Sequence, residues 1–181
     1  PQERASSTGG AGAQVYGRRA SGHFFLTLDA DGDLWMPDWP VMMIDAYAID
    51  TYIAWKRRQD GFAWDLPWEL QWARAARGAD RRLHPWGDHF DPTFCSNARS
   101  SRDGLSVPGV HDFPEDTSPF GIRMMASGVT EICRDAWSSR GPIRHGHGWQ
   151  AEEAKGAGRV ARGGNFAAAA GKARICFRTH V

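Results

Sequence analysis

The sequence has little cysteine, no excess of charge of either sign and no long apolar run. Only three of its 181 residues are cysteine, and Cys95, Cys133 and Cys176 form no CxxC pair, so neither a disulfide framework nor a zinc clip is predicted. Lys and Arg number 22 against 21 Asp and Glu, which gives nucleic-acid binding no electrostatic support. No stretch of about 18 apolar residues occurs, so no membrane span is predicted.

The start of the chain lacks the pattern of a secretory signal peptide. Its first residues are polar and rich in Gly and Ser, not basic and then apolar. Together with the sparse cysteine, this favours a cytoplasmic location. The length and the 41% apolar content predict one folded domain. We expect residues 1–22 to be a flexible lead-in and residues 23–181 to form that domain.

What is abundant is tryptophan and glycine, with nine and 21 residues respectively. This composition predicts irregular loops that are held in place by aromatic rings packed beneath them. Turn residues recur between residues 80 and 140 without sustained periodicity, so this stretch is predicted to be loop-rich.

A few regular elements are nevertheless indicated. Apolar periodicity predicts amphipathic helices over residues 44–58 and 66–78. A β-hairpin is predicted where residues 23–28 meet an acidic turn at 29–33. Near the C-terminus, two strands are predicted over residues 160–162 and 174–178.

Motifs of known chemistry are weak. His145 and His147 lie close together, but without a third ligand nearby we interpret them as a solvated loop. Gly163 and Gly164 lack the other glycines of a phosphate-binding fingerprint and predict a tight turn or bulge. Each cysteine is interpreted as a small buried apolar residue, because none has a basic neighbour spaced to activate it.

A series of motifs does carry a family resemblance. The motifs are PV (40–41), AW (54–55), LPWELQWARAARG (66–78), PWGD (85–88), SPFGI (118–122), MASGVTE (125–131) and RVARGGNF (159–166). In this order and spacing they resemble the formylglycine-generating-enzyme (sulfatase-modifying factor) family. The version found here resembles domains that bacteria fuse to serine/threonine kinases.

The resemblance implies an α+β, C-type-lectin-like fold with two helices, a small twisted antiparallel sheet and extensive irregular loops. The family's final Gly-Phe-Arg strand has no counterpart before Val181, so we expect that strand to be missing. Trp68 stands where the family has a helix-capping Thr, and we expect Asp65 to substitute as the cap.

The resemblance also implies metal chemistry from which this sequence departs. Family enzymes hold copper with two cysteines shortly after the Arg-Gly-Gly motif, but the stretch 167–173 has no thiol, so copper and family catalysis are not expected. Ergothioneine-type relatives place iron ligands in a separate domain. Asn97 and Glu131 match calcium-binding positions, although Gly128 replaces one family ligand. Glu131 is therefore either a calcium ligand or a carboxylate satisfied by backbone amides.

The resemblance finally implies a binding face at the C-terminal end of the chain. In family enzymes the Arg-Gly-Gly loop lines a substrate groove, and in retroelement-diversified variable proteins of this fold the same surface binds ligand. The residues expected there are Trp149, Asn165, Phe166, Ala168, Ala169, Lys172 and Arg174. Packing of Phe166 in the interior is the alternative for that side chain. The small residues 167–170 would make the face shallow, which suits a protein ligand better than a metabolite.

These observations favour a non-catalytic ligand- or protein-binding module, not an enzyme, on a scaffold of the kind that retroelements diversify. Two alternatives stay open. One is a sulfatase-modifying type of oxidoreductase, and the other is a sensory domain attached to a serine/threonine kinase.

Overall fold

The computed structural model describes residues 16–26, 36–42, 44–100, 106–142 and 158–181. It divides the chain into two compact units, Pro1–Trp39 and Pro40–Val181. None of the helices in these described ranges is long and apolar enough to cross a membrane.

The first unit contains a short antiparallel hairpin. Strand β1 (Tyr16–Arg18) pairs with β2 (Phe24–Leu26), and Gly22 in the connecting turn has a positive φ of 85°. Residues 16–18, which were expected to belong to a flexible lead-in, form this first strand, and the flexibility of the lead-in stays a prediction. The predicted hairpin also has a different partner strand, because Phe24–Leu26 pair with Tyr16–Arg18, which precede them in the chain. The predicted acidic turn at 29–33 lies outside the described residues.

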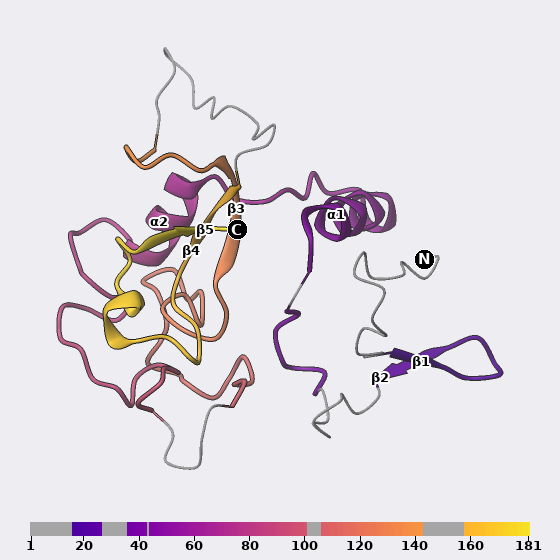
Figure 1. Cartoon of the computed structure of the whole chain (residues 1–181), viewed down its shortest axis with the longest axis horizontal. Helices are drawn as coiled ribbons and strands as arrows, with labels where there is room; N and C mark the ends of the chain where they lie inside the picture. Colours follow the sequence, from indigo (N-terminus) through magenta and orange to yellow (C-terminus); the bar gives the residue numbers. More distant parts are fainter. Residues whose placement is uncertain (1–15, 27–35, 43, 101–105, 143–157) are drawn as a thin grey trace. The chain divides into compact units, whose positions relative to one another are not determined.

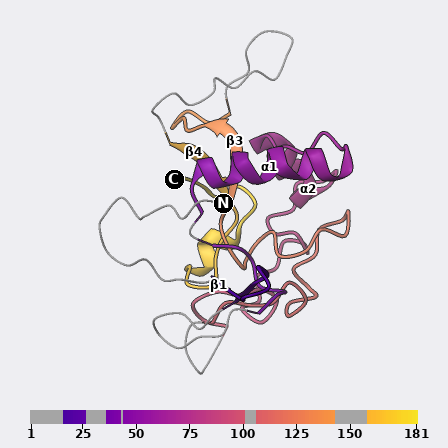
Figure 2. The ribbon, with the colours of Figure 1, turned by 90° about the vertical axis from the view of Figure 1, so that its right-hand side faces the viewer.

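The second unit begins with helix α1 (Ala46–Asp60), which confirms the predicted first helix. Its ends are set by local chemistry. Asp45 accepts a hydrogen bond from the Ala48 amide at 2.7 Å, and Gly61 adopts the left-handed conformation while its amide donates to Arg57 O. Figure 2 shows α1 lengthwise. Ile49 is the one residue of this helix that is buried.

Helix α2 (Glu69–Arg77) confirms the second predicted helix but not its predicted cap. The carboxylate that accepts the Glu69 amide, at 2.5 Å, belongs to Asp135, which lies 66 residues further along the chain. Asp65 instead pairs with Arg134, at 2.7 Å between Oδ2 and Nη1. A tertiary contact therefore performs the task that the sequence assigned to a local one.

The sheet has three antiparallel strands in the order β3-β4-β5, which lie beside α2 in Figure 1. Strand β3 (Glu131–Ala136) pairs with β4 (Arg159–Arg162) across an irregularity in register, and β4 pairs with β5 (Arg178–His180). The predicted strand at 160–162 is confirmed. The strand predicted at 174–178 is displaced, because a 3₁₀ helix, η1 (Ala170–Ala173), precedes it and pairing begins only at Arg178.

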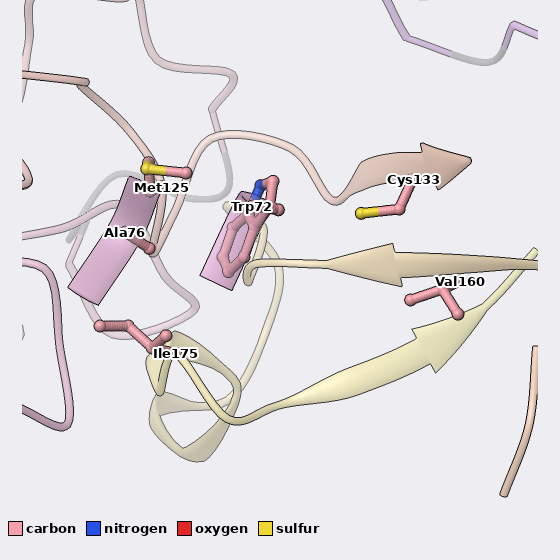
Figure 3. Close-up of a cluster of buried hydrophobic side chains, with 6 residues drawn as sticks. All are labelled: Trp72, Ala76, Met125, Cys133, Val160 and Ile175. Atoms are coloured by element: carbon pink, nitrogen blue, oxygen red, sulfur yellow. The ribbon is translucent and has the colours of Figure 1, made fainter. Parts of the chain in front are cut away.

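The main core lies where α2 meets this sheet (Figure 3). Trp72 is its largest side chain and is 2% exposed, and the cluster as a whole contains Trp72, Ala76, Met125, Cys133, Val160 and Ile175. A second buried cluster consists of Cys95, Ala126 and Ala173, and the half-buried Trp86 and Phe90 pack against it. Aromatic rings therefore do pack against the loops, in keeping with the composition.

A buried ion cluster joins α2 to the sheet. Glu69, 1% exposed, accepts a hydrogen bond from Arg162 Nη1 at 3.1 Å and bonds from Arg178, including Nη2 to Oε2 at 2.8 Å. Arg162 also donates to Ile175 O at 2.7 Å and lies over the Trp72 ring at 5.1 Å. The cluster fixes the helix against both β4 and the segment that leads into β5.

Candidate ligand-binding face

The loop that follows β4 begins with two glycines that no other residue could replace without a clash. Gly163 has a φ of 79°, and a Cβ on it would lie 3.0 Å from Met125 O. A Cβ on Gly164 would lie 2.5 Å from Ala126 O. The pair therefore lets the loop lie directly against the backbone of residues 125–126, in keeping with the predicted tight turn.

Backbone and side-chain hydrogen bonds hold the next part of the loop. Asn165 Nδ2 donates to Thr130 Oγ1 at 3.2 Å, and its Oδ1 accepts from the Ala167 amide at 3.1 Å. The Phe166 amide donates to Gly128 O at 3.0 Å, and the Phe166 side chain is half-buried. Asn165 therefore braces the loop, and its amide has polar partners within the protein.

The alanine stretch is only partly exposed. Ala167 and Ala169 are exposed, but Ala168 is buried at 6% exposure, and its carbonyl accepts a hydrogen bond from the Ala98 amide at 3.0 Å. Ala168 was expected to lie on the surface, and the structure contradicts this. Its small side chain serves packing between two loops, so a large residue at 168 would disturb the fold.

The end of the loop rests on aromatic side chains. His84 Nδ1 forms a hydrogen bond with Ala173 O at 2.9 Å. The His84 ring also stacks on the Trp86 ring, with 4.9 Å between the ring centroids. Burial lowers the pKa of His84, so the ring is neutral at pH 7 and Nδ1 donates to the carbonyl. Lys172 and Arg174, on either side of this anchored residue, are exposed.

A buried carboxylate supports the loop from the other side. Asp116 is fully buried and accepts hydrogen bonds from the Ser127 hydroxyl at 2.6 Å and from the Ala126 amide at 3.1 Å. Burial raises its pKa to about 6 despite these bonds. The carboxylate thereby fixes the segment on which Gly163 and Gly164 lie.

The three thiols do not match the pair of copper-binding cysteines that formylglycine-generating enzymes have. Cys95 and Cys133 are buried, and burial raises their pKa values to about 11 and about 12, so both stay protonated. Cys176 is exposed, contrary to its interpretation as a buried apolar residue. Within the described ranges, no three or more His, Cys, Asp or Glu residues come together as a metal site. We derive no chemical step through copper.

The two residues implied in calcium binding have other partners. Asn97 is 3% exposed, its Oδ1 accepts from the Arg99 amide at 2.9 Å, and its Nδ2 donates to Cys95 O. Glu131 accepts a hydrogen bond from Trp72 Nε1 at 2.5 Å, and burial raises its pKa. The partner of Glu131 is an indole and not the predicted backbone amides. Calcium binding at these residues stays a prediction.

Some predicted residues cannot be placed, and others were missed. Trp149, His145 and His147 lie outside the described residues. Sequence reasoning missed Arg99, which the contact between Ala98 and Ala168 brings to the alanine stretch, and His84, which anchors its end. The PWGD motif lies beside His84 and was the available signal for the anchor, but nothing local connects Arg99 with the C-terminal loop.

Comparison with known proteins gives a family and a fold. Residues 29–181 match the model of the Sulfatase-modifying factor enzyme 1-like domain. Hercynine oxygenase of Mycolicibacterium thermoresistibile is 31% identical over 159 residues, which cover 78% of this chain and 32% of that protein. The uncharacterized protein YfmG of Bacillus subtilis is 40% identical over 68 residues, 38% of this chain and 13% of that protein. The chain thus spans at most a third of the length of either relative.

Among solved structures, PvdO from Pseudomonas aeruginosa superposes with a TM-score of 0.67 at 16% identity, over 93% of this chain and 66% of that one. Variable protein 1 of Treponema denticola gives a TM-score of 0.49 at 22% identity, over 65% of this chain and 41% of that one. The match to PvdO, with the two helices and the three-stranded antiparallel sheet, confirms the predicted α+β, C-type-lectin-like fold.

The prediction that the chain is not an enzyme is contradicted by the relative that is an oxygenase by name and matches over most of this chain. The absence of the two cysteines argues only against copper held by a cysteine pair. It does not argue against enzymes of the family that use other residues.

Proposed function

This chain belongs to the family of sulfatase-modifying factor enzyme 1-like domains, and we propose that it is the substrate-binding domain of an oxygen-dependent enzyme. The similarity to a hercynine oxygenase over most of the chain supports the enzyme class. Its binding surface, in this proposal, is the alanine face, defined as Ala167, Ala169, Lys172 and Arg174 together with the adjoining Arg99.

One observation carries this assignment: the loop backbone is fixed while its side chains stay open to solvent. Ala168, Ala173 and Ile175 are buried and Ala173 is tied to His84, yet Ala169, Lys172 and Arg174 between and beside them are exposed. A surface that is ordered before binding loses little conformational entropy when a ligand arrives. Recognition residues of this kind are commonly presented by loops on a rigid scaffold.

A protein segment fits this face better than a compact metabolite. Side chains at 167 and 169 end at Cβ, so between the charged residues the surface consists largely of backbone and methyl groups. Metabolite sites are typically concave and bury most of the ligand, whereas an extended peptide binds along an open surface. That Trp149 also contacts the ligand stays a prediction, and so does the diversification of this segment.

The experiment compares two Ala→Glu variants at exposed positions. A printed array of random octapeptides is probed with the wild-type chain, with Ala169→Glu on the face, and with Ala63→Glu on the connection between α1 and α2. We expect peptides retained by the wild type to bind at least tenfold more weakly to Ala169→Glu and unchanged to Ala63→Glu. Circular dichroism confirms that both variants are folded.

Two results would overturn the proposal. One is an array on which no octapeptide is retained by the wild type above background. The other is equal retention by wild type and Ala169→Glu, which would place the binding surface elsewhere.

A further inference from the structure

We propose that the alanine face binds an acidic peptide segment. This inference rests on the proposed function, since it names the chemistry of the segment bound at the same face. Three cations carry it: Arg99, Lys172 and Arg174, all exposed.

The three cations come from two segments that hydrogen bonds hold together. Ala98, next to Arg99, donates its amide to Ala168 O at 3.0 Å. The Lys172 amide donates to Ala169 O at 2.9 Å, which turns the chain through η1. Arg174 follows the buried Ala173. These bonds therefore join the segment of Arg99 to the loop that carries the exposed alanines, Lys172 and Arg174.

None of the three cations has an acidic partner among the described residues. This contrasts with other basic residues of the chain: Arg82 pairs with Asp80 at 2.7 Å, Arg134 with Asp65, and Arg162 with Glu69. Within the described part of the chain, the Lys172 ammonium group lies over the Phe177 ring, 5.4 Å from Nζ to the centroid, and a ring does not neutralise its charge.

The charge of Arg174 also acts on His84, the residue that holds the end of the loop. Burial is the main cause that lowers the pKa of His84, and the charge of Arg174 lowers it further, while the hydrogen bond to Ala173 O and the charge of Asp88 act in the opposite direction. Asp88 uses Oδ1 to accept the Leu83 amide at 2.9 Å, and no ion pair joins it to Arg174 in the described structure. The Arg174 guanidinium therefore has no carboxylate paired with it among the described residues and is open to a carboxylate of a ligand.

An acidic peptide fits these cations better than nucleic acid or a small anion. Nucleic-acid binding draws on many phosphate contacts and on exposed aromatic rings for stacking, whereas this face has three cations and its two phenylalanines, Phe166 and Phe177, are half-buried. A closed anion pocket needs buried donors, but all three cations are exposed. Separated charges on an open surface match carboxylates spaced along an extended chain.

The test uses fluorescence anisotropy with three labelled peptides of the same length, (Gly-Glu)₄, (Gly-Gln)₄ and (Gly-Lys)₄. We expect the wild-type chain to bind the Glu peptide at least tenfold more tightly than the Gln peptide, with the difference shrinking as salt is raised. The double variant Lys172→Glu/Arg174→Glu should lose this preference and favour the Lys peptide. Circular dichroism checks that the double variant is folded.

A matched control reverses the charge of Arg58 on α1, which is exposed and has no ion pair within the described ranges. Arg58→Glu should leave all three affinities unchanged. Equal binding of the Glu and Gln peptides, or no binding of the Glu peptide, would overturn the acidic specificity, and octathymidylate binding that exceeds Glu-peptide binding would assign the face to nucleic acid instead. The proposed function survives these outcomes if Ala169→Glu still weakens retention on the octapeptide array at least tenfold.

Discussion

The two helices look alike in the sequence and differ sharply in the structure. Both have apolar residues at helical spacing, yet α1 leaves Tyr52 and Trp55 60% and 46% exposed, whereas Trp72 in α2 is 2% exposed. Helix α2 lies against β3 and β4, and its polar residue Glu69 is buried as well. Periodicity therefore identified an apolar face in each helix but did not identify what covers it.

The two helices are also stabilised by different interactions. Helix α1 relies on local ones: the Asp45 cap, the left-handed Gly61, the Lys56–Asp60 pair at 3.1 Å and the contact between the Tyr52 and Trp55 rings. Helix α2 depends on residues far away in the sequence, including its cap. This difference leads to predictions that begin with the largest effect.

Removing the corresponding tryptophan from each helix is the most direct test of the comparison. Trp72→Ala should lower the free energy of unfolding by about 3–5 kcal/mol, because it leaves a cavity in the main core. Trp55→Ala should lower it by less than about 1 kcal/mol, since much of that ring already contacts water. Urea unfolding followed by far-UV circular dichroism measures both. Equal losses would mean that the face of α1 is covered.

The buried ion cluster should come next in magnitude. Glu69→Gln leaves Arg162 buried without a counter-charge, so we expect a loss of roughly 3 kcal/mol. Glu115→Gln, at an exposed position, is the control and should stay within about 0.5 kcal/mol of the wild type. If the two variants unfolded at the same urea concentration, the cluster would contribute nothing to the docking of α2.

The distant cap of α2 should contribute less. Asp135→Ala removes the acceptor of the Glu69 amide, and about 1 kcal/mol of stability should be lost. Asp135→Asn keeps an oxygen at that position and should lose less. Thermal unfolding of the two variants decides the question, and an Asn variant no better than the Ala variant would show that the amide needs no cap.

The smallest expected effect is a pH dependence that comes from the buried carboxylate of Asp116. The folded-state pKa of Asp116 is raised to about 6, so the folded protein binds this proton more tightly than the unfolded chain does. Its contribution is therefore present at low pH and is lost as the pH rises through 6. Asp116→Asn stays neutral and should gain about 1 kcal/mol relative to the wild type between pH 5 and pH 7.5.

Measuring the wild type and Asp116→Asn side by side cancels the opposite trend of His84, whose lowered pKa favours unfolding as the pH falls below its usual value. A difference in stability that stays constant between pH 5 and pH 7.5 would mean that Asp116 does not titrate in this range.

The candidate site was predictable in its position but not in its composition. The Arg-Gly-Gly motif indicated the loop, and Lys172 and Arg174 are indeed exposed there. Ala168 could not be recognised as buried, because its contact is Ala98, 70 positions earlier in the sequence. Arg99 was missed for the same reason.

The sequence by itself determined the family, the fold class, both helices and the strand at 160–162, because motif order, apolar periodicity and end-capping residues are properties of short segments. Only the tertiary structure decided which helix is buried, which carboxylate caps α2 and which cations lie around the exposed alanines. Each of these depends on contacts between residues far apart in the chain, and such contacts form only when the sheet, the buried ion cluster and the aromatic support of the loops come together.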